Sequence, residues 1–165
     1  MNTKYLLETP FRWLRFNIAV PYILGPNVLD IGCHDSKLKE YLPKSVNYIG
    51  CEFDYSIFYS KKFDTIVLLA VIEHIEPSKL KKMFKMLSDH LYIKGRIVIT
   101  TPTKKAKKIL DILAKFKLLE PKGIEEHKYY LTKTELLNLG VSSGFKLYTY
   151  KLFEFGFNQL IVFEK

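Results

Sequence analysis

One short stretch constrains the fold most: an apolar strand that runs into a glycine and a polar loop. It reads VLDIGCHDS over residues 28–36, and a helix-like segment follows to Leu42. A strand, a tight glycine turn and a helix N-terminus form a site for a nucleotide-like ligand, because backbone N–H groups converge there. Gly32 lacks a Cβ, so the backbone can approach that ligand closely. We expect Asp30 at the strand end to face the same ligand.

An acidic residue follows at the spacing that suits a ribose. Glu52 lies about 20 residues after Gly32, at the end of the next apolar run, Val46–Cys51. A carboxylate can accept hydrogen bonds from two vicinal ribose hydroxyls, and it disfavours a ribose that carries a phosphate. Glu52 is therefore the predicted ribose ligand.

The remaining pattern predicts an α/β fold. Apolar runs at Asn27–Ile31, Val46–Cys51, Asp64–Leu69 and Arg96–Thr100 are nearly continuous, as expected for parallel strands covered on both faces. Two further strands, 145–153 and 157–164, are predicted to form an antiparallel hairpin near Glu154 and Gly156.

Helices are predicted between these strands. Apolar residues at helical spacing indicate a helix over Pro77–Leu91. Thr132 and Glu135 predict a capping box for a helix to about Leu139, with Gly140 and Gly144 following it.

Four stretches in this order resemble the motifs of class I S-adenosylmethionine-dependent methyltransferases. Residues 28–33 (VLDIGC) are similar to their first motif, and residues 49–52 (IGCE) to the second, whose acidic residue binds the cofactor ribose. The resemblance continues in residues 63–75 (FDTIVLLAVIEHI) and 95–102 (GRIVITTP), and spans about residues 27–163. The best match is a small branch with Glu-His after one strand and Thr-Pro after the next.

The resemblance implies a fold, a cofactor and an activity. The fold is a Rossmann-like three-layer sandwich, with a mostly parallel sheet of about six strands and an antiparallel C-terminal strand. The cofactor is S-adenosylmethionine, and the activity is methyl transfer. The implied cofactor-binding residues are Asp30, Gly32, Cys33, His34, Glu52, Leu69 and Ala70.

The acceptor side is expected beyond the strand that ends at Leu69. His74 and His127 are the candidate catalytic residues, as base or acceptor contact, and Glu73 could orient a histidine. Each of these residues could instead be structural. We expect no metal, because no suitable cysteine spacing exists.

The chain departs from the family pattern in two places. His34 and Ser36 stand where the family's loop usually has glycines, so a side chain lies near the methionine part of the cofactor. Only Phe53–Lys62 separates the second strand from the third, which is too short for a helix, a strand and a helix. One edge strand is therefore predicted to be missing.

We expect one domain over residues 1–165, with a cofactor-binding core at 27–165. Residues 1–26 are predicted to form helical pieces broken at Pro10 and Pro21. This segment either packs on the sheet edge or acts as a lid, with Trp13 or Phe16 on the pocket.

Charge and composition leave the acceptor open. The net charge is +9, from 26 basic and 17 acidic residues, and all but three of the basic residues are lysine. This balance suits solvated surfaces or non-specific attraction to anions. The basic amphipathic stretch from Thr103 to Leu119 could meet a membrane surface or a nucleic acid, or simply be hydrated. Cys33 and Cys51 are expected to be buried and unpaired, and without a signal peptide or membrane span a cytoplasmic location is expected.

Three functions remain from the sequence. The leading one is a methyltransferase with a small-molecule, saccharide or lipid-like acceptor. The second is a methyltransferase of nucleic acid or protein, and the positive net charge favours this function. The third is a methyltransferase-like domain that binds the cofactor or a partner without catalysis. The oligomeric state is not predicted.

Overall fold

A six-stranded sheet forms the centre of the protein in the computed structural model, which describes residues 6–52, 61–116, 118 and 129–165. The strand order is β2-β1-β3-β4-β6-β5. Strands β1 to β4 are mutually parallel, and β6 is antiparallel to both of its neighbours. The predicted sheet is thereby confirmed. The bounds are β1 (Asn27–Ile31), β2 (Asn47–Cys51), β3 (Phe63–Leu69), β4 (Leu91–Pro102), β5 (Lys146–Phe153) and β6 (Asn158–Glu164).

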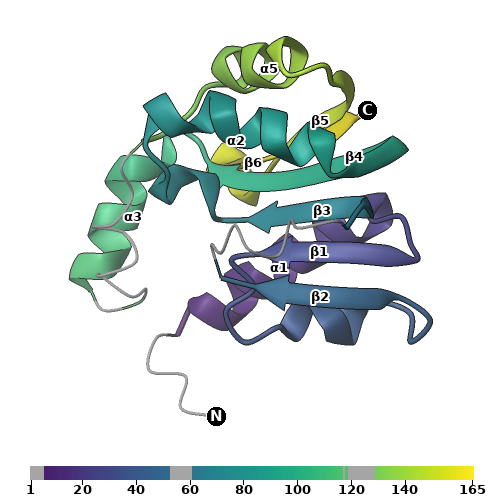
Figure 1. Ribbon diagram of the computed structural model, residues 1–165. Helices are drawn as coiled ribbons and strands as arrows, with labels where there is room; N and C mark the ends of the chain where they lie inside the picture. Colours follow the sequence, from purple (N-terminus) through teal and green to yellow (C-terminus); the bar gives the residue numbers. More distant parts are fainter. Residues whose placement is uncertain (1–5, 53–60, 117, 119–128) are drawn as a thin grey trace.

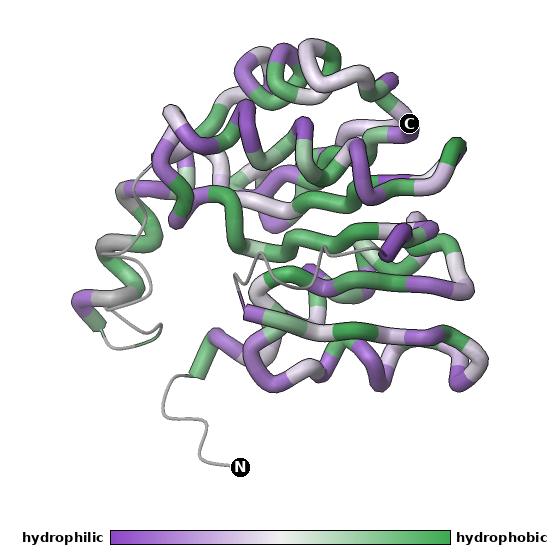
Figure 2. Tube along the Cα trace, in the orientation of Figure 1, coloured by the Kyte–Doolittle hydropathy of each residue, from purple (hydrophilic) through white to green (hydrophobic). Residues whose placement is uncertain are grey.

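Helices cover both faces of the sheet, which gives the predicted three layers (Figure 1). Alternate residues of a strand point to opposite faces. Leu29 and Ile66 pack under α2 (Pro77–Asp89) and α5 (Lys133–Ser142). Their neighbours Val28 and Val67 belong to clusters on the other face, which also include residues of α1 (Glu8–Ala19). Figure 2 shows the central strands as largely hydrophobic, as burial on both faces requires.

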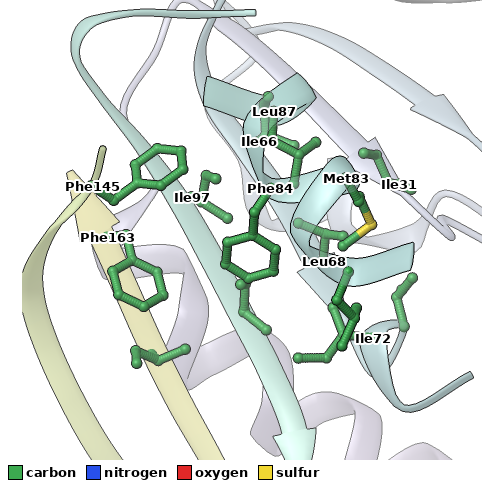
Figure 3. Close-up of a cluster of buried hydrophobic side chains, with 14 of the residues drawn as sticks. Ile31, Ile66, Leu68, Ile72, Met83, Phe84, Leu87, Ile97, Phe145 and Phe163 are labelled. Atoms are coloured by element: carbon green, nitrogen blue, oxygen red, sulfur yellow. The ribbon is translucent and has the colours of Figure 1, made fainter. Parts of the chain in front are cut away.

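The core beneath α2 is built around a group of aromatic rings (Figure 3). The Phe84 ring of α2 meets the Phe163 ring of β6 edge-on at 6.2 Å between centroids, and Phe145 lies 6.1 Å from Phe163. The helical spacing in residues 77–91 correctly predicts the buried face of α2. The predicted end at Leu91 is wrong, because His90 ends the helix and Leu91 pairs with Phe63 as the first residue of β4.

The N-terminal helix α1 runs without interruption from Glu8 to Ala19. The predicted break at Pro10 is wrong, because Pro10 lies in the first helical turn. N–H groups in that turn have no intrahelical acceptor, so proline costs no hydrogen bond there. Pro21 lies in the 3-10 turn η1 (Val20–Tyr22) that follows the helix, near the predicted second break.

Helix α5 begins with the predicted capping box. The Thr132 hydroxyl accepts the Glu135 N–H at 3.2 Å, and the Glu135 carboxylate accepts the Thr132 N–H at 2.7 Å. Gly140 lies inside the helix rather than after it, which corrects the predicted end. A Cβ at Gly140 would lie 2.3 Å from the Phe163 ring, so glycine lets α5 approach the sheet.

Two shorter elements complete the part that bears on the site. The helix-like segment after the glycine loop is the 3-10 helix η2 (Lys37–Tyr41), and the basic stretch forms α3 (Ala106–Lys115). Within the described ranges, no helix is both long and apolar enough to cross a membrane. The segment in which an edge strand was predicted to be missing lies mostly outside the described residues, and β2 is the edge strand of the observed sheet.

Candidate active site

A cavity of about 410 Å³ lies at the carboxyl ends of β1, β3 and β4. Its walls come from one side of α1, the loop after β1, the turn after β3, and Pro102 at the end of β4. Leu110 of α3 and Asn158 of β6 complete the lining, and Figure 1 shows α3 beside this end of the sheet. Ligands of open α/β sheets bind beyond the strand carboxyl ends, and small-molecule sites measure roughly 300–1,000 Å³. This cavity is therefore the candidate active site.

The loop after β1 has a backbone that favours glycine. Gly32 has a φ of +73°, and a Cβ there would lie 2.6 Å from the Val71 side chain. Its N–H donates to the Cys51 carbonyl at 2.7 Å, which ties the loop to β2. His34 and Ser36 also have left-handed backbones, with φ values of 49° and 55°. Glycine would adopt this conformation without strain. His34 and Ser36, which replace glycines of the motif, therefore retain the backbone conformation of a glycine loop.

Asp30 at the end of β1 is held by a tyrosine from the neighbouring strand. The Tyr48 hydroxyl donates to Asp30 Oδ2 at 2.6 Å. Burial raises the pKa of Asp30 to about 6, with the Glu52 carboxylate adding to the effect and the Tyr48 hydrogen bond opposing it. Tyr48 is a residue that the sequence reasoning missed. It lies in the predicted second strand, opposite Val28 in the sheet, but only the pairing register brings it beside Asp30.

Glu52 is bonded to the glycine loop. Its exposed carboxylate accepts the His34 N–H through Oε1 at 3.0 Å. Glu52 is therefore at the edge of the loop that lines the cavity, although it is not itself a lining residue. Ala70, which follows β3, has an unusual φ of 58° for a residue with a side chain. Apart from Glu52, all predicted cofactor-binding residues line the cavity: Asp30, Gly32, Cys33, His34, Leu69 and Ala70.

Helix α1 forms one wall of the cavity. The lining residues recur at helical spacing along one face: Glu8, Phe11, Arg12, Arg15 and Phe16. Arg12 Nη1 also lies 3.0 Å from Asp35 Oδ2, which joins α1 to the glycine loop. Trp13 was expected on the pocket but is 53% exposed and does not line it. Its alternative Phe16 does, and the two arginines lie on the same face of the helix at spacings of one and four residues from Phe16.

A buried carboxylate follows β3. Glu73 in η4 (Ile72–His74) is 1% exposed and lines the cavity. Its Oε2 accepts the Thr101 hydroxyl at 3.0 Å, whereas its Oε1 has no hydrogen-bond partner among the described residues. Burial raises the pKa of Glu73 to about 7, against the opposing effects of its own backbone N–H, the Arg15 charge and the Thr101 hydrogen bond.

Arg15 faces Glu73 from α1. Its Nε is buried without a hydrogen-bond partner in the described part of the chain. Burial lowers the pKa of Arg15, and the charges of Glu73 and Glu154 oppose that change. The Glu73 carboxylate accepts a hydrogen bond from Thr101, and its expected role in orienting a histidine stays a prediction.

The two predicted catalytic histidines have different outcomes. His74 lines the cavity next to Glu73, as expected from its place after the strand. His127 lies outside the described residues, so its predicted role stays a prediction. The cavity therefore brings together His74, the glycine loop and the α1 wall.

Comparison with known proteins identifies the family. A family model described as a methyltransferase domain matches residues 8–150. This chain belongs to the methyltransferase family. The match includes α1 as well as the glycine loop and the turn after β3, so every lining residue of the cavity except Asn158 lies within the matched range.

Individual relatives are distant in sequence. A tRNA U34 carboxymethyltransferase from Nautilia profundicola is 29% identical over an aligned length of 126 positions, and the match covers 58% of this chain and 41% of that protein. The chain thus spans less than half the length of this curated relative.

Solved structures share the fold of this methyltransferase. One described as an S-adenosylmethionine-dependent methyltransferase from Archaeoglobus fulgidus has a TM-score of 0.72 at 16% identity, and 94% of each chain is covered. A magnesium protoporphyrin IX methyltransferase from Synechocystis PCC 6803, solved with S-adenosylhomocysteine bound, has a TM-score of 0.58 at 14% identity, with 96% of this chain and 81% of that one covered. The predicted class I methyltransferase fold, the enzyme class and S-adenosylmethionine as cofactor are confirmed at the level of the family.

Proposed function

We propose that this methyltransferase transfers the methyl group of S-adenosylmethionine to a small molecule that enters the cavity beneath α1. In this proposal the cofactor lies against the glycine loop, with its ribose on Glu52 and its methionine part beside Asp30 and Gly32. The bound cofactor supplies a methyl group already activated by its positive sulfur, so the protein has to align and desolvate the two reactants.

The features of the loop fit such a cofactor. Gly32 leaves the backbone open to the cofactor, and a Cβ at this position would clash with the Val71 side chain. One carboxylate oxygen of Glu52 accepts the His34 N–H. The side chain is exposed, so the carboxylate can also accept ribose hydroxyls. Leu69 and Ala70 line the opposite wall, where backbone groups can meet the adenosine.

The α1 wall is the observation that carries the small-molecule proposal. Five side chains of α1 lie on the cavity, and Arg12 binds Asp35 on the far side of the cofactor loop. The Arg12–Asp35 ion pair holds this helix against the glycine loop, and its side chains take up room that a bulky acceptor would need. The lining combines aromatic carbon from Phe11 and Phe16 with six charged side chains, which can orient a polar small molecule.

An RNA acceptor is the second candidate. The relative from Nautilia profundicola is named for its action on tRNA, and the net charge of +9 favours attraction to a polyanion. A nucleotide could enter the cavity only if it is unpaired or flipped out of its stack.

Methyl transfer from labelled cofactor decides between the candidates. The protein is incubated with S-adenosylmethionine labelled on its methyl group, and with either total tRNA or a low-molecular-mass cell extract. We expect label in the small-molecule fraction and none in tRNA. Label in tRNA alone would replace the small-molecule proposal with the RNA one. Binding of unlabelled S-adenosylhomocysteine, measured by calorimetry, is the separate test of the cofactor site.

A further inference from the structure

We propose that Glu73 receives the proton of the acceptor's nucleophile, so that the methylated atom is a hydroxyl oxygen or an amine nitrogen. This inference rests on the proposed cofactor site and deepens it. It assigns a catalytic group where the sequence suggested a histidine.

The first observation is an unsatisfied hydrogen-bond acceptor. Glu73 is 1% exposed, its Oε2 is bound by Thr101, and its Oε1 has no partner among the described residues. A buried carboxylate oxygen without a donor is unfavourable, so such a group in a native fold calls for an explanation. The side chain is shielded from bulk water, and it lines the cavity, so a ligand in the cavity can supply a donor to Oε1.

The second observation is the set of groups that hold the carboxylate in place. Thr101 fixes one oxygen from β4, and Arg15 faces the group from α1. The charge of Arg15 favours the ionised form of Glu73, which is the form that can accept a proton. Burial acts in the opposite direction and brings the pKa of Glu73 to about 7. A general base works best with a pKa near the operating pH.

The third observation separates Glu73 from two other carboxylates. Asp30 is also buried and also lines the cavity, but Tyr48 donates a hydrogen bond to its Oδ2, and no buried oxygen of Asp30 lacks a partner among the described residues. Glu154 in η5 (Glu154–Gly156) also has an oxygen without a partner, but it does not line the cavity, and its Oε2 accepts the Asn158 amide. Glu73 follows β3 directly and shares the cavity wall with Ala70 and His74. Like Asp30 it is a buried carboxylate on the cavity, but it lies in the turn after β3, where Arg15 faces it from α1.

The resulting step is balanced without a further reactant. A lone pair of the acceptor's oxygen or nitrogen forms a bond to the methyl carbon while the carbon–sulfur bond breaks. The electron pair of that bond stays on sulfur, which leaves S-adenosylhomocysteine. The proton of the hydroxyl or amine passes to Glu73. An acceptor atom without a hydrogen, such as a thioether sulfur, would make no use of this carboxylate.

A pair of cofactor analogues tests the position of Glu73 without knowledge of the acceptor. Sinefungin carries an amine where S-adenosylmethionine carries its methyl group, and S-adenosylhomocysteine carries nothing there. If Glu73 faces the transferred methyl, the ammonium group of sinefungin donates a charge-assisted hydrogen bond to it. We expect calorimetry to show sinefungin binding to the wild-type protein about tenfold or more tightly than S-adenosylhomocysteine.

Three variants complete the test. Glu73→Gln should reduce this preference to about threefold or less, while affinity for S-adenosylhomocysteine stays nearly unchanged. Glu154→Gln is the matched control, because it removes the other buried charge beside Arg15, and it should keep the preference. Thr101→Val retains the carboxylate but removes its anchor, so it should lower the preference and serves if Glu73→Gln does not fold.

Clear results would overturn the inference. One such result is a wild-type protein that does not prefer sinefungin over S-adenosylhomocysteine. A second is a preference that survives Glu73→Gln or, where that variant does not fold, Thr101→Val. A third is an equal loss of the preference in Glu154→Gln. Absence of S-adenosylhomocysteine binding in the wild-type protein is a different result, because it contradicts the proposed cofactor site itself.

Discussion

Substitution of Glu52 by alanine is the most direct test of the cofactor site. In the proposed complex its carboxylate accepts two ribose hydroxyls, and hydrogen bonds to a charged group contribute about 1.5–3 kcal/mol each. Glu52 is exposed, so water competes for it, and we take the lower end of that range. The total of about 3 kcal/mol corresponds to a roughly hundredfold loss of affinity for S-adenosylhomocysteine.

The structure also predicts how a milder substitution behaves. Glu52→Gln keeps an oxygen that can accept the His34 N–H, which is 3.0 Å from Oε1 in the wild-type protein. The loop should therefore keep its shape, and the loss of charge alone should weaken binding about tenfold. Glu40 in η2 is an exposed glutamate away from the cavity lining, so Glu40→Ala is the control and should bind normally.

Titration calorimetry with S-adenosylhomocysteine measures all four proteins under one condition. The expected order of affinity is wild type and Glu40→Ala, then Glu52→Gln, then Glu52→Ala. Thermal unfolding without ligand should change little, because the His34 N–H is exposed and water can replace its partner. Affinity of Glu52→Ala within threefold of the wild type would refute the assignment of the ribose site.

Three further predictions concern stability. Gly140→Ala should lower the melting temperature by up to about 8 °C in a thermal scan, because overpacking against Phe163 costs about 1–3 kcal/mol and the helix gain of about 1 kcal/mol offsets only part of it. A rise would contradict the tight contact, and Phe163→Leu should relieve it. Thr132→Ala should cost about 1–2 kcal/mol in urea unfolding through loss of the capping box, and an unchanged midpoint would show that the cap contributes nothing. Asp30 has a pKa of about 6 in the fold against 3.8 ordinarily, so the folded state binds its proton more tightly and the free energy of unfolding should fall, by up to about 3 kcal/mol, as pH rises from 4 to 6. Asp30→Asn should flatten that profile in urea unfolding, and parallel profiles would refute the assignment. The raised pKa values of Glu73 and Glu154 leave the same residual slope in both proteins.

Local patterns in the sequence were sufficient for the sheet and for one side of the site. The near-continuous apolar runs located all six strands to within a few residues, with the early start of β4 at Leu91 as the largest difference. Gly32 and the Thr132 capping box were also predictable, because a left-handed φ and a helix cap depend on residues close together in the chain. The acidic residue after the second strand and His74 after the third were located by the same logic of strand ends.

Helix boundaries were less accurate where packing decides them. Gly140 seemed to end a helix, yet it lies inside α5 because the helix comes close to Phe163, a residue more than 20 positions away. Pro10 seemed to break a helix, yet it occupies the first turn, and the position of that turn depends on where α1 begins. Propensity alone does not supply either piece of information.

The residues around Glu73 in the cavity could be identified only from the tertiary structure. Arg15 comes from α1, Glu73 follows β3 and Thr101 lies on β4, and their sequence separations show no pattern that joins them. Tyr48 meets Asp30 only because β1 and β2 pair in one register. Backbone conformation and strand periodicity are local properties, because they depend on residues that are close together in the sequence. The burial of a charge and the identity of its partner arise only when distant elements pack together, and these properties determine the chemistry of Glu73.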